Sequence, residues 1–338
     1  MKKFLSMVFL IAAVFAELTR QEHQMPGIYE PHPNQESYFH FYLDYGYHNE
    51  SLYAYASSSN AFLHIAGNPN EKPALYCALA FDGLMEGVIR ATLDDRVSSN
   101  AWREVAEGRP KADSGTSPEA YSALLSGNAD IIFCFEPSDA QLRQARELGV
   151  SYKLTPLGKD AFVFFVNKQN PVRNLSSKQI QDIYSGKTTN WRLVGGRDAA
   201  IHAFQRPKNS GSQTILEKVM NGIPLITPPT EYYHVSMRDI IEAAANYRNA
   251  ENALGYSFLY YASEMVRNEQ IKLLSFDGIA PTRENIQNET YPFTETFYAI
   301  TIEGRETENT KKLLQWLSSA EGQKLVELSG YTSYKPAE

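Results

Sequence analysis

Cysteine is scarce in this sequence, which contains only Cys77 and Cys134 among 338 residues. Two cysteines do not form a structural zinc site by themselves, and the histidines show no ligand spacing beside them. A chain of this length builds an adequate core without a disulfide. We therefore expect no metal and no cofactor, and we interpret both cysteines as small buried hydrophobic residues. The alternative is a single Cys77–Cys134 disulfide in an oxidising compartment.

Basic residues are not in excess either, because 32 Lys and Arg stand against 39 Asp and Glu, for a formal net charge of -7. A general nucleic-acid binder needs a basic face, so we expect no nucleic-acid partner. The balance does not exclude a small anion, since local dipoles and a single cation attract one whatever the global charge.

The N-terminus carries an apolar run that is too short to span a bilayer comfortably. Lys2 and Lys3 precede residues 4–16, which are apolar apart from Ser6. This pattern predicts a signal peptide over residues 1–16 that is cleaved after Ala16, and hence a periplasmic or secreted protein. An uncleaved anchor is the alternative. No cysteine lies near the segment, so it offers no site for a lipid-anchored N-terminal cysteine.

The remaining chain divides into an extension and an alternating α/β body. Residues 17–69 are rich in tyrosine and show weak periodicity. From Pro73 onward strands alternate with helices, which predicts an α/β fold with mostly parallel sheets. The length favours two lobes joined by crossing strands. The expected strands cover residues 74–80, 129–135, 160–167, 200–206, 253–262 and 271–276, and the expected helices 84–89, 117–127, 176–186, 212–222, 309–319 and 321–330.

One polar motif follows the predicted strand at residues 200–206. Arg206 ends this strand, and Ser210-Gly211-Ser212 opens the next helix. The first amides of a helix lack intrahelical partners and suit an oxyanion, Gly211 permits close approach, the hydroxyls donate and the guanidinium supplies charge. The alternative is an ordinary helix cap beside a surface arginine.

A second motif of the same kind lies at another junction between strand and helix. Ser114, Gly115 and Thr116 precede the predicted helix 117–127, whose expected cap is Ser117. Ordinary capping is again the alternative. Two such junctions, one in each half of the chain, together favour a clamp that closes on one anion.

Enzyme signatures are missing. Gly186-Lys187-Thr188 has the tail of a P-loop but ends a helix, with Gln181 where the first glycine is required, and no G-x-S-x-G motif occurs. We therefore expect a protein that is not an enzyme. A hydrolase with Ser210 or Ser212 as nucleophile and His202 or His234 as base is a minor alternative.

From Pro73 to the C-terminus the chain resembles the PstS-like phosphate-binding proteins of ABC transporters, in the type II periplasmic binding protein superfamily. The resemblance rests on residues 155–196 (TPLGKDAFVFFVNKQNPVRNLSSKQIQDIYSGKTTNWRLVGG), 203–214 (AFQRPKNSGSQT) and 252–258 (NALGYSF). It implies a two-lobed fold, each lobe a mixed, mostly parallel sheet flanked by helices, joined by crossover strands. It places lobe I at 70–163 plus 270–338 and lobe II at 164–269.

The resemblance also implies a ligand and its partners. The protein is expected to be a monomer that captures inorganic phosphate, or a related oxyanion, and passes it to a membrane ABC permease. The implied ligand-binding residues in the two motifs are Arg206, Ser210, Gly211, Ser212, Ser114, Gly115 and Thr116. The first loop contributes Ala78 and Leu79, and Glu136 after the third strand stands where an acid that accepts a phosphate proton is expected.

The first loop departs from the family pattern, because Leu79 and Ala80 replace hydroxyl residues. Each lost hydrogen bond to a charged ligand costs about 1.5–3 kcal/mol. A paralogue without ligand, or with an altered one, that acts as a sensor or interaction protein is therefore the runner-up interpretation.

Overall fold

A computed structural model describes residues 50–56, 73–92, 112–246 and 250–334 of the chain. The chain divides into two compact units, Met1–Asp44 and Tyr45–Glu338, and every described residue belongs to the second. The predicted signal peptide at 1–16 and most of the extension at 17–69 lie outside the described residues. Among those described, no helix is long and apolar enough to cross a membrane.

The extension contributes one described helix, α3 (Glu50–Ala56), which packs beside α4 (Asp82–Thr92) and α13 (Ala320–Leu328). Tyr55 of this helix donates a hydrogen bond to the carbonyl oxygen of Glu321 at 3.2 Å. The described end of the extension is therefore attached to the body.

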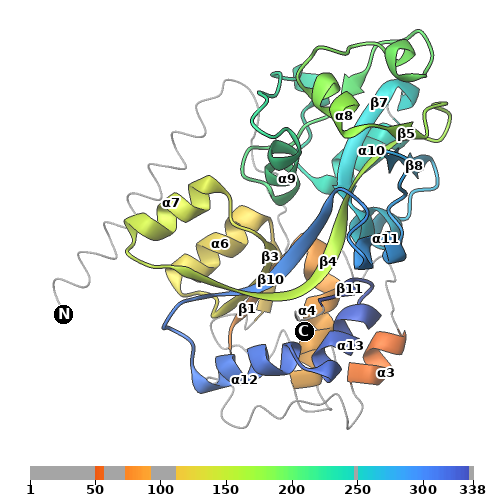
Figure 1. Ribbon diagram of the computed structural model, residues 1–338. Coiled ribbons are helices and arrows are strands. Elements are labelled where there is room, and N and C mark those ends of the chain that lie inside the picture. The colour runs from red at the N-terminus through yellow and green to blue at the C-terminus, as the bar shows by residue number, and fades with distance from the viewer. Residues whose placement is uncertain (1–49, 57–72, 93–111, 247–249, 335–338) are drawn as a thin grey trace. The chain divides into compact units, whose positions relative to one another are not determined.

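A nine-stranded sheet organises the described body, with the order β2-β1-β3-β10-β4-β7-β6 and with β11 and β8 pairing with β4 (Figure 1). Strand pairs β1–β2, β1–β3 and β6–β7 are parallel, whereas β4 and β10 pair antiparallel with their neighbours. The strands are β1 (Leu75–Ala78), β2 (Ala112–Gly115), β3 (Ile131–Phe135), β4 (Tyr152–Asn167), β5 (Asn174–Leu175), β6 (His202–Ala203), β7 (Ala253–Phe258), β8 (Ile271–Leu273), β9 (Ser275–Phe276), β10 (Thr294–Ile302) and β11 (Thr332–Ser333).

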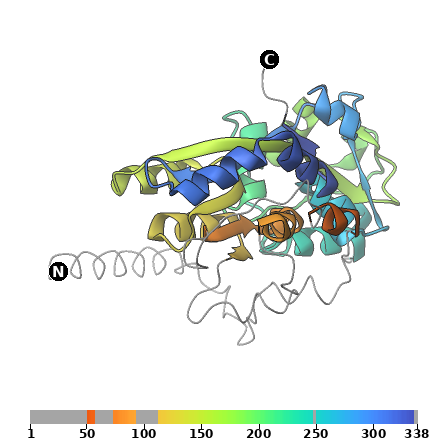
Figure 2. The same cartoon turned by 90° about the horizontal axis from the view of Figure 1, so that it is seen from below.

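Helices flank both ends of this sheet. Figure 1 shows α6 beside β3, with α7 outside α6, and α8, α9 and α10 around β7. Figure 2 shows the blue C-terminal helices running along the long yellow-green strand β4, on which α13 packs. The remaining helices are α6 (Ser117–Ser126), α7 (Asp139–Glu147), α8 (Ser177–Tyr184), α9 (Gly211–Val219), α10 (Met237–Asn246), α11 (Arg283–Gln287) and α12 (Glu308–Leu317). Short 3-10 turns occupy Leu79–Phe81, Trp191–Val194, Thr230–Tyr232 and Ala250–Asn252, and a π-helical turn occupies Tyr261–Val266.

The predicted α/β class is confirmed, but strand pairing in the middle of the sheet is antiparallel instead of parallel. Parallel pairing holds among the outer strands at each end, as the alternating strand and helix pattern predicts. The two long strands between the ends run antiparallel, because β4 and β10 pair along nine positions, from Thr294↔Ala161 to Ile302↔Tyr152. The crossing strands expected between two lobes are therefore the middle of one continuous sheet.

Strand β4 carries the centre of the core. Residues 157–166 are all buried, which explains why 161–166 reads as a continuous apolar run instead of an alternating one. Phe164 is fully buried and lies within 5.2 to 6.1 Å, between ring centroids, of five aromatic rings, those of Phe162, Tyr184, Tyr256, Phe276 and Phe293.

The two cysteines are both buried and both free thiols. The β1–β3 register pairs Cys77 with Phe133, so the neighbouring residue Cys134 lies one step out of phase. Because side chains alternate across a strand, the two thiols point to opposite faces of the sheet. The preferred interpretation as small buried residues is confirmed, and the disulfide alternative is wrong.

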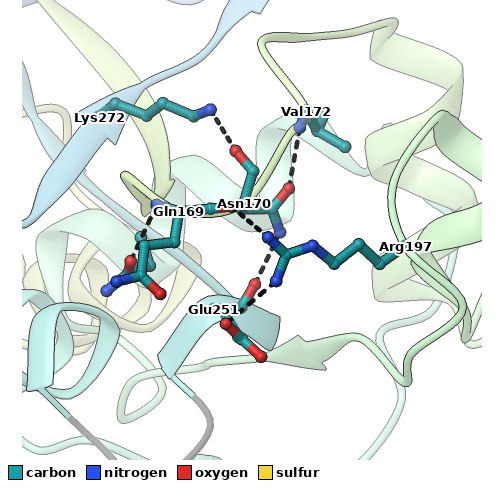
Figure 3. Close-up of polar contacts among 7 residues, drawn as sticks. Gln169, Asn170, Val172, Arg197, Glu251 and Lys272 are labelled. Carbon is teal, nitrogen blue, oxygen red and sulfur yellow. Dashed lines mark hydrogen bonds and ion pairs between the residues drawn. The ribbon is translucent and has the colours of Figure 1, made fainter.

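A polar network fixes the chain where it leaves β4 (Figure 3). The Asn170 side chain accepts from the Val172 amide at 2.9 Å and donates to the Glu251 carbonyl at 2.8 Å, while Lys272 donates to the Asn170 carbonyl. Arg197 pairs with the Glu251 carboxylate at 3.2 Å. None of these bonds involves a residue of the two polar motifs, and their backbone partners identify the network as structural.

Replacing the central aromatic ring should be costly. We expect Phe164→Ala to lower the free energy of unfolding by about 3–5 kcal/mol, because it removes apolar burial and leaves a cavity. Leu193→Ala is the matched control, since this side chain is 63% exposed and its loss should change stability by no more than about 0.5 kcal/mol. Urea unfolding measures both, and equal effects would contradict this assignment of the core.

Candidate functional site

Ser210 occupies the cap position of α9, yet its hydroxyl does not cap the helix. No side-chain cap hydrogen bond is present, and Ser210 Oγ is buried without a hydrogen-bond partner in the structure. By contrast, Ser138 and Ser176 each accept from the amide of the third helical residue. A buried hydroxyl without a partner is costly, so this group is suited to an external acceptor.

Arg206 is buried beside this helix start, with only 7% of its surface exposed. Its guanidinium donates to Ser212 Oγ at 2.8 Å and to the Val235 carbonyl at 2.8 Å, while its Nε is buried without a partner. Within the described part of the chain no carboxylate forms an ion pair with it. The alternative of a surface arginine is therefore wrong.

The backbone of Arg206 is held in place from behind. Its amide donates to Gln213 Oε1 at 3.0 Å and to the Tyr256 hydroxyl at 3.0 Å, and Tyr256 in turn donates to Gln213. Burial lowers the pKa of Arg206, because it disfavours the charged form. An arginine remains charged even so, and a bound anion would stabilise this buried cation.

The two polar motifs, far apart in sequence, meet in the structure. A Cβ added to Gly211 at the start of α9 would lie 2.7 Å from Ser117 Oγ at the start of α6. Gly211 is therefore required for close approach, as its sequence position predicts, although what approaches is another part of the chain. Two helix N-termini, each with partial positive charge, converge at this point.

The three predicted ligand-binding residues before α6 differ in whether their polar groups are already engaged within the protein. Ser114 is 9% exposed, and its Oγ has no hydrogen-bond partner in the structure. Thr116 forms a capping box, in which its amide and hydroxyl donate to the Glu119 carboxylate at 2.6 and 2.9 Å. Gly115 lies directly against Glu119 and Tyr76, so any Cβ there would collide with them. Capping, the alternative considered from sequence, holds for Thr116 but not for Ser114.

The first loop follows β1 as a 3-10 turn and leads into α4. Ala78 is buried and pairs in register with Gly115, and Leu79 follows it at the carboxyl end of the strand. These positions adjoin the second motif as predicted, but they bring alkyl groups. The Ala80 carbonyl accepts from the Tyr331 hydroxyl, which ties the loop to the C-terminal part of the chain.

Asp82 is an acidic residue in this region that the sequence analysis missed. Its carboxylate is buried; Oδ1 accepts from the Cys77 thiol at 3.1 Å, and Oδ2 has no partner. The nearby Ser114 side chain lowers the pKa of Asp82, but burial dominates and raises that pKa to about 7. Only the pairing of β1 with β2 brings these residues together, so no local signal could have identified them.

A buried tyrosine lies within electrostatic reach of both Asp82 and the arginine. The Tyr261 hydroxyl lies within electrostatic reach of Asp82 and of Arg206, and burial raises its pKa to about 12. The acid and the cation therefore both act on the pKa of one tyrosine. An anion that carries a proton could satisfy both ends, with the guanidinium as donor and the carboxylate as acceptor.

Glu136, the acid predicted from sequence, is already engaged. Its carboxylate lies 2.7 Å from Lys218 Nζ and accepts from the Tyr298 hydroxyl at 3.3 Å. The hydrogen bond from Lys218 holds the pKa of Glu136 below its ordinary value. That Glu136 accepts the proton of a bound phosphate stays a prediction.

The hydrolase alternative lacks its base. The His234 ring packs edge-on against Phe204 at 4.5 Å between centroids, and the His202 ring stacks on Tyr232 at 4.7 Å. Of the hydrogen bonds within the described ranges, none joins either histidine to Ser210 or Ser212. The arrangement can bind a small anion, but it shows no activated nucleophile.

A sheet with long crossing strands, and a buried cation where two helix starts converge, define a two-lobed binding protein. The family model described as PBP superfamily domain matches residues 97–321, so the chain belongs to that family.

Proteins named phosphate-binding protein PstS are similar to this chain. The one from Bacillus subtilis (strain 168) is 24% identical over 263 residues, which cover 77% of this chain and 81% of the relative. The one from Borreliella burgdorferi is 24% identical over 192 residues, which cover 56% of this chain and 68% of the relative. The resemblance to PstS-like proteins is thereby confirmed.

Two solved structures share the fold. A putative phosphate ABC transporter substrate-binding protein with bound phosphate from Clostridium perfringens matches with a TM-score of 0.60 and 23% identity, covering 78% of this chain and 100% of its own. An ABC-type phosphate transport receptor from Vibrio cholerae matches with a TM-score of 0.56 and 23% identity, covering 77% and 99%.

The Asp82 carboxyl should make stability depend on pH. Because its pKa rises from 3.8 in the unfolded chain to about 7 in the fold, the folded protein holds a proton that the unfolded chain releases across this interval. The free energy of unfolding should therefore fall as pH rises from 3.8 to about 7, and level off above that.

Asp82→Asn should remove this contribution, so that its urea-unfolding profile falls less steeply with pH than that of the wild type. Asp160 is a second buried carboxyl whose burial raises its pKa to about 7, and it is present in both proteins. The difference between the two profiles therefore isolates Asp82. Parallel profiles would show that this carboxyl does not titrate as described.

Proposed function

We propose that this protein is a solute-binding protein that captures inorganic phosphate, or a closely related oxyanion, without chemical change to it. The observation that carries the proposal is Arg206, a buried guanidinium with no carboxylate partner in the described residues, beside the partnerless hydroxyl of Ser210. Leaving a charge uncompensated in the interior is strongly unfavourable, so a bound anion completes the site.

Each group in the site would have a distinct role. Arg206 neutralises charge, and Ser212, whose Oγ already accepts from Arg206, is left with a hydroxyl proton to donate. Ser210 and Ser114 donate through hydroxyls that have no other partner. The amides at Gly211 and at the start of α6 add dipoles that favour negative charge.

Asp82 adds a means of selection, and we propose it instead of Glu136 as the acid that faces the ligand. Its carboxylate, once ionised, accepts from a protonated oxyanion such as hydrogen phosphate. Sulfate carries no proton at neutral pH and would meet an uncompensated negative charge instead. The same loop offers Ala78 and Leu79 through their backbone only.

The cellular role follows by family membership. We propose that residues 1–16 direct export, that the mature monomer lies in the periplasm or outside the cell, and that it delivers its ligand to a membrane ABC permease. Lobe I is proposed at 70–163 plus 270–338 and lobe II at 164–269. The packing of α6 on β1 and β3, and of α9 and α10 on β7, supports this division.

A second candidate function is a sensor or interaction protein that binds no phosphate. The Glu119 carboxylate favours it, because it already occupies the amide and hydroxyl of Thr116. Calorimetric titration with phosphate, arsenate and sulfate decides between the two. Heat with none of the three would support this candidate and end the proposal above.

Removing the cation should abolish tight binding. We expect Arg206→Met to weaken phosphate affinity by at least about thirtyfold, since loss of a buried charged partner costs about 2–5 kcal/mol. Arg192→Met is the matched control, because that side chain is 69% exposed and its ion pair, within the described residues, is with Asp198 at 3.5 Å. Similar affinities of the two variants in isothermal titration would refute the site.

Removing the Ser210 hydroxyl should separate ligand binding from helix capping. We expect Ser210→Ala to lower phosphate affinity by about tenfold to a hundredfold, as for a hydrogen bond of about 1.5–3 kcal/mol. Stability without ligand should not fall, because the hydroxyl caps nothing. A loss of stability of about 1 kcal/mol in urea unfolding, with unchanged affinity, would instead indicate an ordinary cap.

A further inference from the structure

Helix α9 carries predicted ligand groups at one end and a charged cluster at the other. Gly211 and Ser212 lie in its first turn, and Lys218 lies in its last. Lys218 Nζ lies 2.7 Å from Glu136 Oε2 and 3.2 Å from Glu295 Oε2. One ammonium group therefore forms ion pairs with two carboxylates.

The two acids lie in or next to strands of a different part of the sheet from the strand on which α9 packs. Glu136 directly follows β3, and Glu295 lies near the start of β10. Helix α9 itself packs on β7, and the Val219 carbonyl at its end accepts from Gln181 of α8 at 2.9 Å. The cluster thus links the β6–β7 end of the sheet to the β3–β10 region.

The charges in the cluster depend on one another. The carboxylates raise the pKa of Lys218, and the hydrogen bond from Lys218 lowers the pKa of Glu136. Glu295 is only 19% exposed at its side chain, and burial raises its pKa despite Lys218. If α9 moved away, two adjacent carboxylates would lose their shared cation and repel each other.

We propose that Lys218 is a positioning residue that holds the start of α9 against the start of α6, and so raises the affinity of the anion site without touching the anion. The contact that it preserves is the approach of Gly211 to Ser117. The inference rests on the proposed function, because the benefit is measured on phosphate. A partly exposed ion pair with no positioning role would leave phosphate affinity unchanged.

The first test is isothermal titration of inorganic phosphate against charge variants of the full chain. Lys218→Met should weaken affinity about three- to tenfold at low salt, and Lys218→Arg should restore most of it. Lys178→Met is the matched control and should bind like the wild type, because Lys178 pairs with Asp182 within α8 alone. Equal losses in Lys218→Met and Lys218→Arg, or no loss in either, overturn the inference.

A double-variant cycle shows whether the acids act through Lys218. Glu295→Gln should weaken binding less in the Lys218→Met background than in the wild type. Added salt should reduce the difference between wild type and Lys218→Met, because the cluster is partly exposed. Full additivity of the two substitutions counts against the inference.

A second readout needs no ligand. Spin labels at Glu147→Cys and Leu193→Cys lie on exposed positions of α7 and of the 191–194 turn, and the native thiols are buried. In phosphate-free protein, Lys218→Met should shift the label separation to longer distances, and Lys178→Met should not.

The two readouts keep the proposals distinguishable. If the wild type gives no heat with phosphate, the proposed function fails. The label distances then test by themselves whether Lys218 holds α9 to the β3–β10 region. An unchanged distance distribution in Lys218→Met overturns that link, whatever the titration shows.

Discussion

A guanidinium held out of water is the constraint on which the candidate site depends. Arg206 is buried, its backbone is fixed by Gln213 and Tyr256, and its side chain donates to two neutral oxygens. Neutral acceptors reduce the cost of burying the cation but leave its charge uncompensated. The two converging helix starts add further positive potential near the guanidinium, where a negative counter-charge would normally be needed. Together these features give a site that is electrostatically incomplete until an anion enters.

The acidic groups around the site shape which anion would enter. Asp82 is buried near Ser114, and Glu119 closes the capping box of α6. Both belong to helices that follow the neighbouring strands β1 and β2. The candidate site thus combines a buried cation with acceptor groups, a combination that suits a small oxyanion that still carries a proton.

Local signals account for what the sequence predicts well. Helices α6, α8 and α9 begin within a residue or two of the predicted starts, because Ser, Thr and Pro at helix starts act over a few residues. The apolar runs of β3 and β4 were recognised for a similar reason, since strands covered on both faces need no polar alternation. By contrast, β10, α7 and α10 were not predicted, and β10 begins with three partly exposed residues, so it lacks a continuous buried run at its start.

The sequence by itself determined the α/β class, the two polar motifs and the family, because each depends on short stretches whose chemistry can be read in order. Only the tertiary structure decided which hydroxyls are free, since Thr116 is occupied by Glu119 while Ser114 and Ser210 are not. It also decided that Asp82 lies beside Ser114 and that Lys218 meets Glu136. These pairings join residues on separate strands and helices, and burial and charge at such contacts arise from packing that no local sequence pattern encodes.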